Sequence, residues 1–150
     1  MILDVVYNHL GPAGNYLFAW SPLFKHAERG DWGDTFDFSR REVRDYVVEN
    51  AAYWISEFHF DGLRIDAIQA MRDESAEHVV AAVAKRARIA ASDREIFLVG
   101  EDEPQETWLL DAGLDALWND DFHHSARVAA TGVVDGYLHD YRGTPQELVS

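Results

Sequence analysis

Short apolar runs alternate with amphipathic stretches along most of this chain. Three of the runs cover residues 2–9, 62–66 and 97–101, and each one becomes polar at its carboxyl end. Apolar residues recur at helical spacing between residues 43 and 58 and again between residues 79 and 87. Strand-like runs that alternate with helical patterns are typical of βα units and of a parallel sheet.

The second half of the chain repeats this alternation more weakly. A short helix is expected over residues 105–111 and a strand over residues 115–119, followed by a helix over residues 122–131. Four βα units make up about half of a (β/α)8 barrel, which typically needs about 250 residues. The predicted fold class is therefore α/β, a partial (β/α)8 TIM barrel of about four βα units.

Turn and cap signals divide the chain between these elements. Ser39-Arg40-Arg41-Glu42 reads as a capping box, and Asp73 or Ser75 is expected near the start of the helix over 79–87. Residues 11–38 are interpreted as a long, aromatic-rich loop after the first strand, and such loops are often functional. Gly113 and Gly132 are expected to end the two later helices.

The chain also reads as part of a longer protein. A helix-start signal, Thr144-Pro145-Gln146-Glu147, stands close to the last residue, Ser150. We therefore interpret residues 1–150 as one fragment of a catalytic barrel whose partner is the missing remainder of that barrel. In isolation such a fragment would leave sheet edges unpaired, so we expect it to be poorly soluble or oligomeric and inactive.

Composition excludes several classes of partner. The formal net charge of −14 argues against nucleic acid or an anionic membrane, because phosphate binding needs clustered Lys and Arg. Hydrophobic residues make up 47% of the chain, enough for a buried core. There is no cysteine and no leader-like or membrane-length apolar run. These features favour a cytoplasmic protein that binds neither nucleic acid nor membrane.

Two carboxylates at strand ends are the candidate catalytic pair. Arg64 and Asp66 lie two residues apart on one strand, so they point to the same side, and a guanidinium holds a carboxylate ionised. Glu101 begins an acidic cluster, in which crowding raises pKa values and favours a general acid. The alternatives are a purely structural ion pair for Arg64 and Asp66, and a solvated acidic loop for Glu101. Facing carboxylates are the minimum equipment for glycoside hydrolysis.

Polar residues also follow the first and fourth strands. Asp4 and Asn8 share strand parity, with His9 just beyond, and this group is either structural or a weak match to a calcium site. Residues 118–124 read Trp-Asn-Asp-Asp-Phe-His-His, whose aromatic and polar side chains suit sugar rings and hydroxyls. Adjacent histidines diverge on a helix and no H-E-x-x-H spacing is present, so we expect no metal and no cofactor.

These motifs together resemble the α-amylase superfamily of glycoside hydrolases. Its first signature block is similar to residues 4–9, its second to residues 62–67 and its third to residues 99–101. The resemblance implies that Asp66 is the nucleophile and Glu101 the acid/base. It further implies that Arg64 holds Asp66, that His9 contacts the sugar, and that Asp4 supports this network. The superfamily's fourth block, with a third catalytic Asp, is not present in this sequence.

Within the superfamily the chain resembles the malto-oligosyltrehalose trehalohydrolase family, chiefly at residues 8–17, 58–62 and 118–124. That family hydrolyses the α-1,4 bond joining trehalose to a maltooligosaccharide. The likeness implies further substrate contacts at Asn8, Tyr16, Asp102, Trp118, Asn119, Asp120, Asp121 and His123. Glycogen branching enzyme is similar in the first two blocks. The chain also fits a non-catalytic α-glucan-binding module with Trp20, Trp32 and Trp118 as stacking platforms, or a truncated product with no function.

Overall fold

Four parallel strands form the main sheet of the protein. The computed structural model describes residues 1–11, 13–30 and 32–148. The strands are β1 (Ile2–Val5), β5 (Gly62–Ile65), β6 (Phe97–Glu101) and β7 (Ala116–Trp118), and they lie in the order β1-β5-β6-β7. Each strand pairs with the next parallel strand along the chain, as in a (β/α) barrel and unlike a doubly wound sheet. The predicted fold, part of such a barrel, is confirmed.

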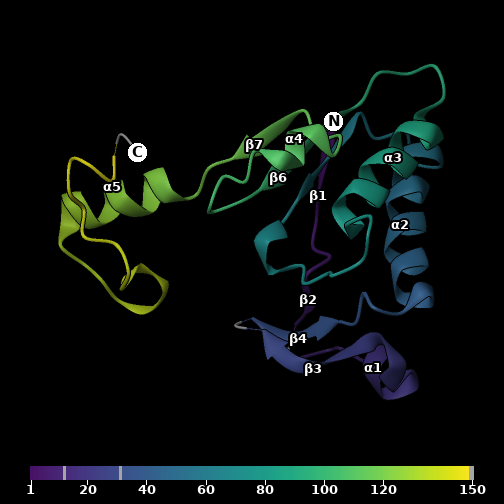
Figure 1. Ribbon diagram of the computed structural model, residues 1–150, viewed down its shortest axis with the longest axis horizontal. Helices are drawn as coiled ribbons and strands as arrows, with labels where there is room; N and C mark the ends of the chain where they lie inside the picture. The colour runs from purple at the N-terminus through teal and green to yellow at the C-terminus, as the bar shows by residue number, and fades with distance from the viewer. Residues whose placement is uncertain (12, 31, 149–150) are drawn as a thin grey trace.

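Two helices cover one face of this sheet. Helix α2 (Arg41–Ser56) connects β1 to β5 and helix α3 (Val79–Ala91) connects β5 to β6, while the short α4 (Trp108–Asp111) leads to β7. Helices α2 and α3 lie side by side on the sheet (Figure 1). Their apolar stripes are fully buried against strand residues, and the members of this core include Val43, Val47, Ile55, Leu63, Ile65, Val83 and Leu98. The 3.6-residue spacing of the sequence therefore identified the packed faces correctly.

The predicted capping residues are wrong for the start of α2 and correct for the start of α3. Arg40 occupies the N-cap of α2 without a side-chain hydrogen bond, because the Ser39 hydroxyl donates to Asp37 instead; the capping box is wrong. Asp73 is confirmed near the start of α3, where its Oδ2 accepts a hydrogen bond of 2.6 Å from the Val79 amide. Arg44 of α2 pairs with the same carboxylate, so this cap also ties the two helices together.

Residues 11–38 are not a structureless loop. They contain α1 (Leu17–Trp20), a 3-10 turn η1 (Pro22–Phe24), β3 (Lys25–Gly30) and β4 (Gly33–Phe36). With β2 (His9–Leu10) the strands form a small antiparallel sheet in the order β2-β4-β3. The expectation failed because β3 carries charged residues without an apolar alternation, whereas pairing with β4 satisfies its backbone. Residues 12 and 31 of the expected loop lie outside the described residues.

The C-terminal part projects from β7 as a separate arm. It contains α5 (Asp121–Thr131), a 3-10 turn η3 (Gly136–Leu138) and the chain that returns along α5 (Figure 1, left). Its own core is a small cluster of three buried residues, Val128, Leu138 and Tyr141. Gly143 lies so close to α5 that a Cβ there would sit 2.4 Å from the Ala129 nitrogen. Only glycine fits this approach, which holds the returning segment against the helix.

The predicted helix-start signal at residues 144–147 makes its capping hydrogen bonds, but no helix follows it among the described residues. The Thr144 amide donates to the Glu147 carboxylate at 3.0 Å, and the Glu147 amide donates to the Thr144 hydroxyl. Residues 145–148 nevertheless form a turn and not a helix. In the described part of the chain, no helix has the length and apolar character needed to cross a membrane.

Candidate active site

The guanidinium of Arg64 stands at the centre of the polar side chains on the carboxyl ends of β1, β5 and β6. Its Nη1 donates to Asp66 Oδ1 at 2.7 Å and to Asp4 Oδ1 at 2.8 Å, and its Nη2 lies 2.7 Å from Glu101 Oε1. Parallel pairing explains why these side chains lie together, because Asp4, Arg64 and Val99 are register partners on neighbouring strands. One cation therefore orients carboxylates from three strands.

Asp66 is held in its ionised form. Asn8 donates from Nδ2 to Asp66 Oδ2 at 3.1 Å and to the Asp66 carbonyl at 2.8 Å. Partial burial opposes ionisation, but the hydrogen bonds from Arg64 and Asn8 outweigh it and lower the pKa of Asp66 below its usual range. An ionised carboxylate that points into a partly buried site has the character needed for a nucleophile.

A strained turn after β5 connects Asp66 to Glu101. Ala67 adopts the left-handed conformation at φ 41°, which is uncommon for a residue with a Cβ and typical of functional sites. Its amide donates to Glu101 Oε2 at 2.8 Å, and the 3-10 turn η2 (Ile68–Ala70) follows directly. Gly100 leaves room for that turn, because a Cβ there would lie 2.5 Å from Ile68 Cδ1. The backbone itself thus fixes the orientation of Glu101.

Glu101 has the opposite electrostatic character to Asp66. Burial, together with a hydrogen bond and charge repulsion from Asp120, raises the pKa of Glu101 to about 7 against the opposing pull of Arg64 and the Ala67 amide. Glu101 also shares a side-chain hydrogen bond with Asp66. The pair therefore consists of one ionised carboxylate and one carboxyl that still carries a proton in a substantial fraction of molecules near neutral pH, which is the division of roles that acid/base chemistry requires.

A pocket of about 750 Å³ opens over this pair. It gathers five of the predicted site residues, which are Asn8, His9, Asp66, Glu101 and Asp120. His9 is oriented by a hydrogen bond between its ring and Asn8. Sequence reasoning assigned no role to several further residues of the wall, among them Arg72, Glu103, Tyr137, His139 and Asp140. Those on the arm carried no signal in the sequence, because their distance from the strand ends depends on how the arm folds back.

Eight other predicted residues do not line this pocket: Arg64, Asp121, His123 and the five described next. Tyr16 precedes α1 and is 72% exposed, so the structure does not bring it to the carboxylates. Asp102 is fully buried and accepts a hydrogen bond from the Glu106 amide, so it supports the turn after β6 and does not face a ligand. Asn119 accepts a hydrogen bond from the Phe122 amide at the start of α5. Asp4 is connected to the site through its hydrogen bond from Arg64. The centroid of the Trp118 ring lies 5.7 Å from the Arg64 guanidinium carbon.

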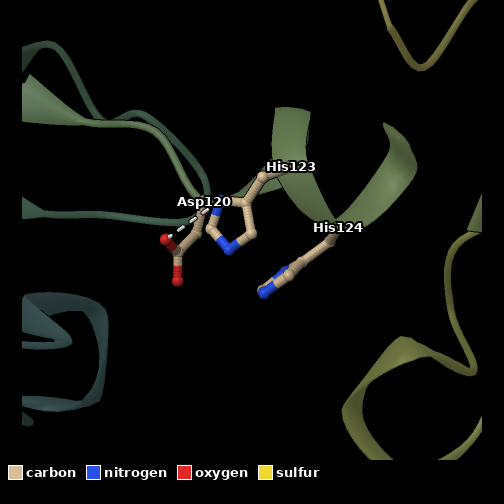
Figure 2. Close-up of side chains that lie close together, drawn as sticks. All are labelled: Asp120, His123 and His124. Carbon is tan, nitrogen blue, oxygen red and sulfur yellow. Dashed lines mark ion pairs between the residues drawn. The ribbon is translucent and has the colours of Figure 1, made fainter. Parts of the chain in front are cut away.

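The residues that begin α5 form a second polar group at the pocket. Asp121 accepts a hydrogen bond of 2.7 Å from the Tyr141 hydroxyl, and His123 Nδ1 lies 3.6 Å from Asp120 Oδ1. The rings of His123 and His124 meet at a centroid distance of 4.3 Å, and Figure 2 shows both on the same side as Asp120. The argument that these adjacent histidines diverge is therefore wrong, because the first turn of the helix lets both rings swing toward the strand ends.

A second hollow of about 650 Å³ lies at the opposite end of the strands. Arg88, Arg94 and Asp115 are among its lining residues, and the arginines donate there to backbone carbonyls and to Asp115. These groups are already paired, and none of the candidate catalytic carboxylates lies there. In barrel enzymes this amino-terminal end serves stability, while chemistry sits at the carboxyl ends of the strands.

Comparison with known proteins agrees with this geometry, although the sequence matches no family model. A putative α-amylase from Salmonella typhimurium is 40% identical, with a TM-score of 0.77 over 97% of this chain and 26% of that one. The predicted relation to the α-amylase superfamily of glycoside hydrolases is confirmed.

Within that superfamily the resemblance to the malto-oligosyltrehalose trehalohydrolases is confirmed as well. The enzyme of that name from Deinococcus radiodurans is 39% identical over 99% of this chain and 25% of its own length. A 1,4-α-glucan branching enzyme from Thiobacillus denitrificans is 45% identical over 80 residues, which cover 47% of this chain. The chain spans about a quarter of the length of the trehalohydrolases that it matches.

Proposed function

We propose that this chain carries the catalytic pair of a retaining glycoside hydrolase that releases trehalose from maltooligosyltrehalose. The observation that carries the proposal is the bridging of Asp66 and Glu101 by the two terminal nitrogens of Arg64. The close placement supports retention, because each carboxyl lies 2.7 Å from a terminal nitrogen of the same guanidinium, whereas inverting enzymes hold their carboxyls about 6.5–9.5 Å apart to admit a water.

The two carboxyl groups divide the reaction between them. Asp66 attacks the anomeric carbon and forms a glycosyl ester, while Glu101 gives its proton to the departing glycosidic oxygen. Glu101 then takes a proton from water, which attacks the same carbon and releases Asp66. Arg64 and Asn8 keep Asp66 ionised and aimed throughout, and His9 lies on the pocket wall beside it as a sugar contact.

Substrate choice is assigned to the start of α5. Asp120 lies beside the acid/base, Asp121 and His123 offer further carboxylate and imidazole groups at the same helix start, and we assign the leaving sugar to this side. Hydroxyl-rich trehalose pairs with such groups, and ligands that leave them unpaired are rejected. The likeness to enzymes named malto-oligosyltrehalose trehalohydrolase supports trehalose as that leaving unit.

Glucan branching is the second candidate, favoured by the higher identity to a branching enzyme over 80 residues. Both reactions begin with the same glycosyl ester and differ in its acceptor. A branching enzyme transfers the glucan to another sugar hydroxyl, whereas a hydrolase transfers it to water. Product analysis with maltooligosyltrehalose distinguishes them, since only the hydrolase yields trehalose and a shortened maltooligosaccharide without new branches.

The test is Asp66→Asn in the full-length protein. The amide keeps the shape of the side chain but is a poor nucleophile, so trehalose release is expected to fall by roughly 10⁴-fold or more while substrate binding remains. Asp93→Asn is the matched control, because Asp93 is exposed and lies away from the pocket. Strong residual hydrolysis by Asp66→Asn would assign the nucleophile to another group.

A further inference from the structure

Asp120, His123 and His124 present their ligand atoms to one small volume at the start of α5. One oxygen or nitrogen atom from each residue lies within 4.8 Å of those from the other two. The distance of 3.6 Å between Asp120 Oδ1 and His123 Nδ1 is near the roughly 3.4 Å that separates two ligands of tetrahedral zinc with bonds of 2.0–2.1 Å. Figure 2 shows the carboxylate and both rings converging on the same side of the helix start.

A hydrogen-bonded chain behind His124 gives an independent indication of ligation. His124 Nδ1 lies 3.2 Å from the Tyr141 hydroxyl, and that hydroxyl has two carboxylate acceptors, Glu103 Oε1 and, at 2.7 Å, Asp121 Oδ1. With its proton on Nδ1 directed to the tyrosine oxygen, His124 keeps Nε2 as a free lone pair. Metal-binding histidines are usually fixed in this way, through the second ring nitrogen and a carboxylate behind it.

The geometry points to a site for a zinc-type divalent cation formed by Asp120, His123 and His124. Two imidazoles and one carboxylate are the ligand set of several zinc sites that keep a fourth position open. Here that position faces the pocket, because Asp120 and His124 belong to its wall. The donor set disfavours magnesium and calcium, which prefer oxygen atoms throughout.

Occupation of this site has one consequence for the proposed reaction, and it rests on that proposal. Asp120 hydrogen-bonds to Glu101, so a cation on Asp120 sits beside the acid/base and fills the space assigned to the leaving sugar. Zinc and substrate are then competitors. Binding of the metal itself does not depend on which sugar, if any, the protein hydrolyses.

The experiment measures zinc affinity in the full-length protein after treatment with a chelator. Zinc alone is titrated against a chromogenic competitor, and cobalt serves as a spectroscopic probe of the ligand set. His123→Ala removes one of the three proposed ligands. The His123 side chain is 57% exposed, so the fold should tolerate the change. Tyr141→Phe keeps the ring contacts and removes only the hydroxyl behind His124. His59→Ala is the matched control, since His59 is exposed and outside the pocket.

We expect His123→Ala to lose more than tenfold in zinc affinity and to lose the cobalt absorption bands of a nitrogen-ligated site. Removal of the hydroxyl in Tyr141→Phe is expected to weaken zinc by about 10- to 100-fold, the usual effect of losing a partner behind a ligand. His59→Ala should bind as the unmodified protein does. Absence of saturable zinc binding, or unchanged affinity in His123→Ala, would overturn the site. Zinc binding without any glycosidase activity would overturn the proposed function and leave the metal site standing.

Discussion

Two regions of the protein differ in how densely they are packed. One is the four-stranded sheet with helices α2 and α3, and the other is the C-terminal arm. The first region buries more than twenty residues in one core, and Leu63, Ile65 and Leu98 in its strands have no exposed surface. The apolar core of the arm has three buried residues, and the arm exposes Phe122, Val134 and Tyr137 by about half. The proposed catalytic carboxylates lie on the first region, and most of the candidate recognition groups lie on the second.

This difference assigns a task to each region. Reaction chemistry needs atoms held within fractions of an ångström, and strand ends in a dense core supply that precision. Recognition of a variable leaving group tolerates more movement and sits on an element that changes without disturbing the core. The comparison predicts that changes in the first region affect every substrate, whereas changes in the arm affect the choice among substrates.

After Asp66→Asn, the largest effect is expected for Glu101→Gln in the full-length protein. The amide cannot donate a proton as an acid, so kcat should fall by about 10²- to 10⁴-fold. The general acid must be protonated, and the pKa of Glu101 is about 7. Activity of the unmodified protein is therefore expected to decline as the pH rises through about 7, and Glu101→Gln should lose this alkaline limb.

The pH profile of kcat/KM for both proteins is the measurement. Glu95→Gln is the matched control, because Glu95 lies at the opposite end of the strands and should keep both the rate and the limb. The lowered pKa of Asp66 places the acidic limb below the usual range for an aspartate. An alkaline limb that persists unchanged in Glu101→Gln would mean that a different group titrates, and the assignment of the acid would fail.

A pair of leucine truncations compares the packing of the two regions directly. Leu98→Ala in the core should cost about 2–5 kcal/mol of the free energy of unfolding, the usual range for a fully buried leucine. Leu138→Ala in the arm should cost less than half as much, because few neighbours surround it and they can close the cavity. Urea unfolding measures both costs, and hydrogen exchange should show the second loss confined to α5 and the residues after it. Equal costs would show that the arm is part of one cooperative core.

The same two regions differ in how much the sequence could predict. Strands β1, β5 and β6 and helices α2 and α3 follow directly from apolar periodicity, since each element buries one well-defined face. The meeting of Arg64, Asp66 and Glu101 follows as well, because carboxyl ends of neighbouring parallel strands share one edge. Regular elements therefore carried their functional residues to predictable places.

Positions that depend on irregular backbone were not predictable in this way. Asp102 directly follows Glu101 in the sequence, yet the turn after β6 buries it completely. Tyr16 lies outside the predicted site because residues 11–38 contribute to a small sheet of their own. His124 joined the pocket only through the fold of the arm, where Tyr141 holds its ring. No periodic signal encodes such placements, which arise from long-range contacts.

The smallest and most selective effect is expected for Asp121→Ala. Asp121 lies on the arm next to Asp120 of the pocket wall, and its Oδ1 accepts a hydrogen bond of 2.7 Å from the Tyr141 hydroxyl. Loss of one paired hydroxyl contact should reduce kcat/KM on maltooligosyltrehalose by roughly 10-fold, but change it little on plain maltooligosaccharide. The ratio of the two values is the measurement, and Asp111→Ala, an exposed site on α4, is the matched control. Equal losses on both substrates would remove Asp121 from trehalose recognition and would end the division of tasks between core and arm.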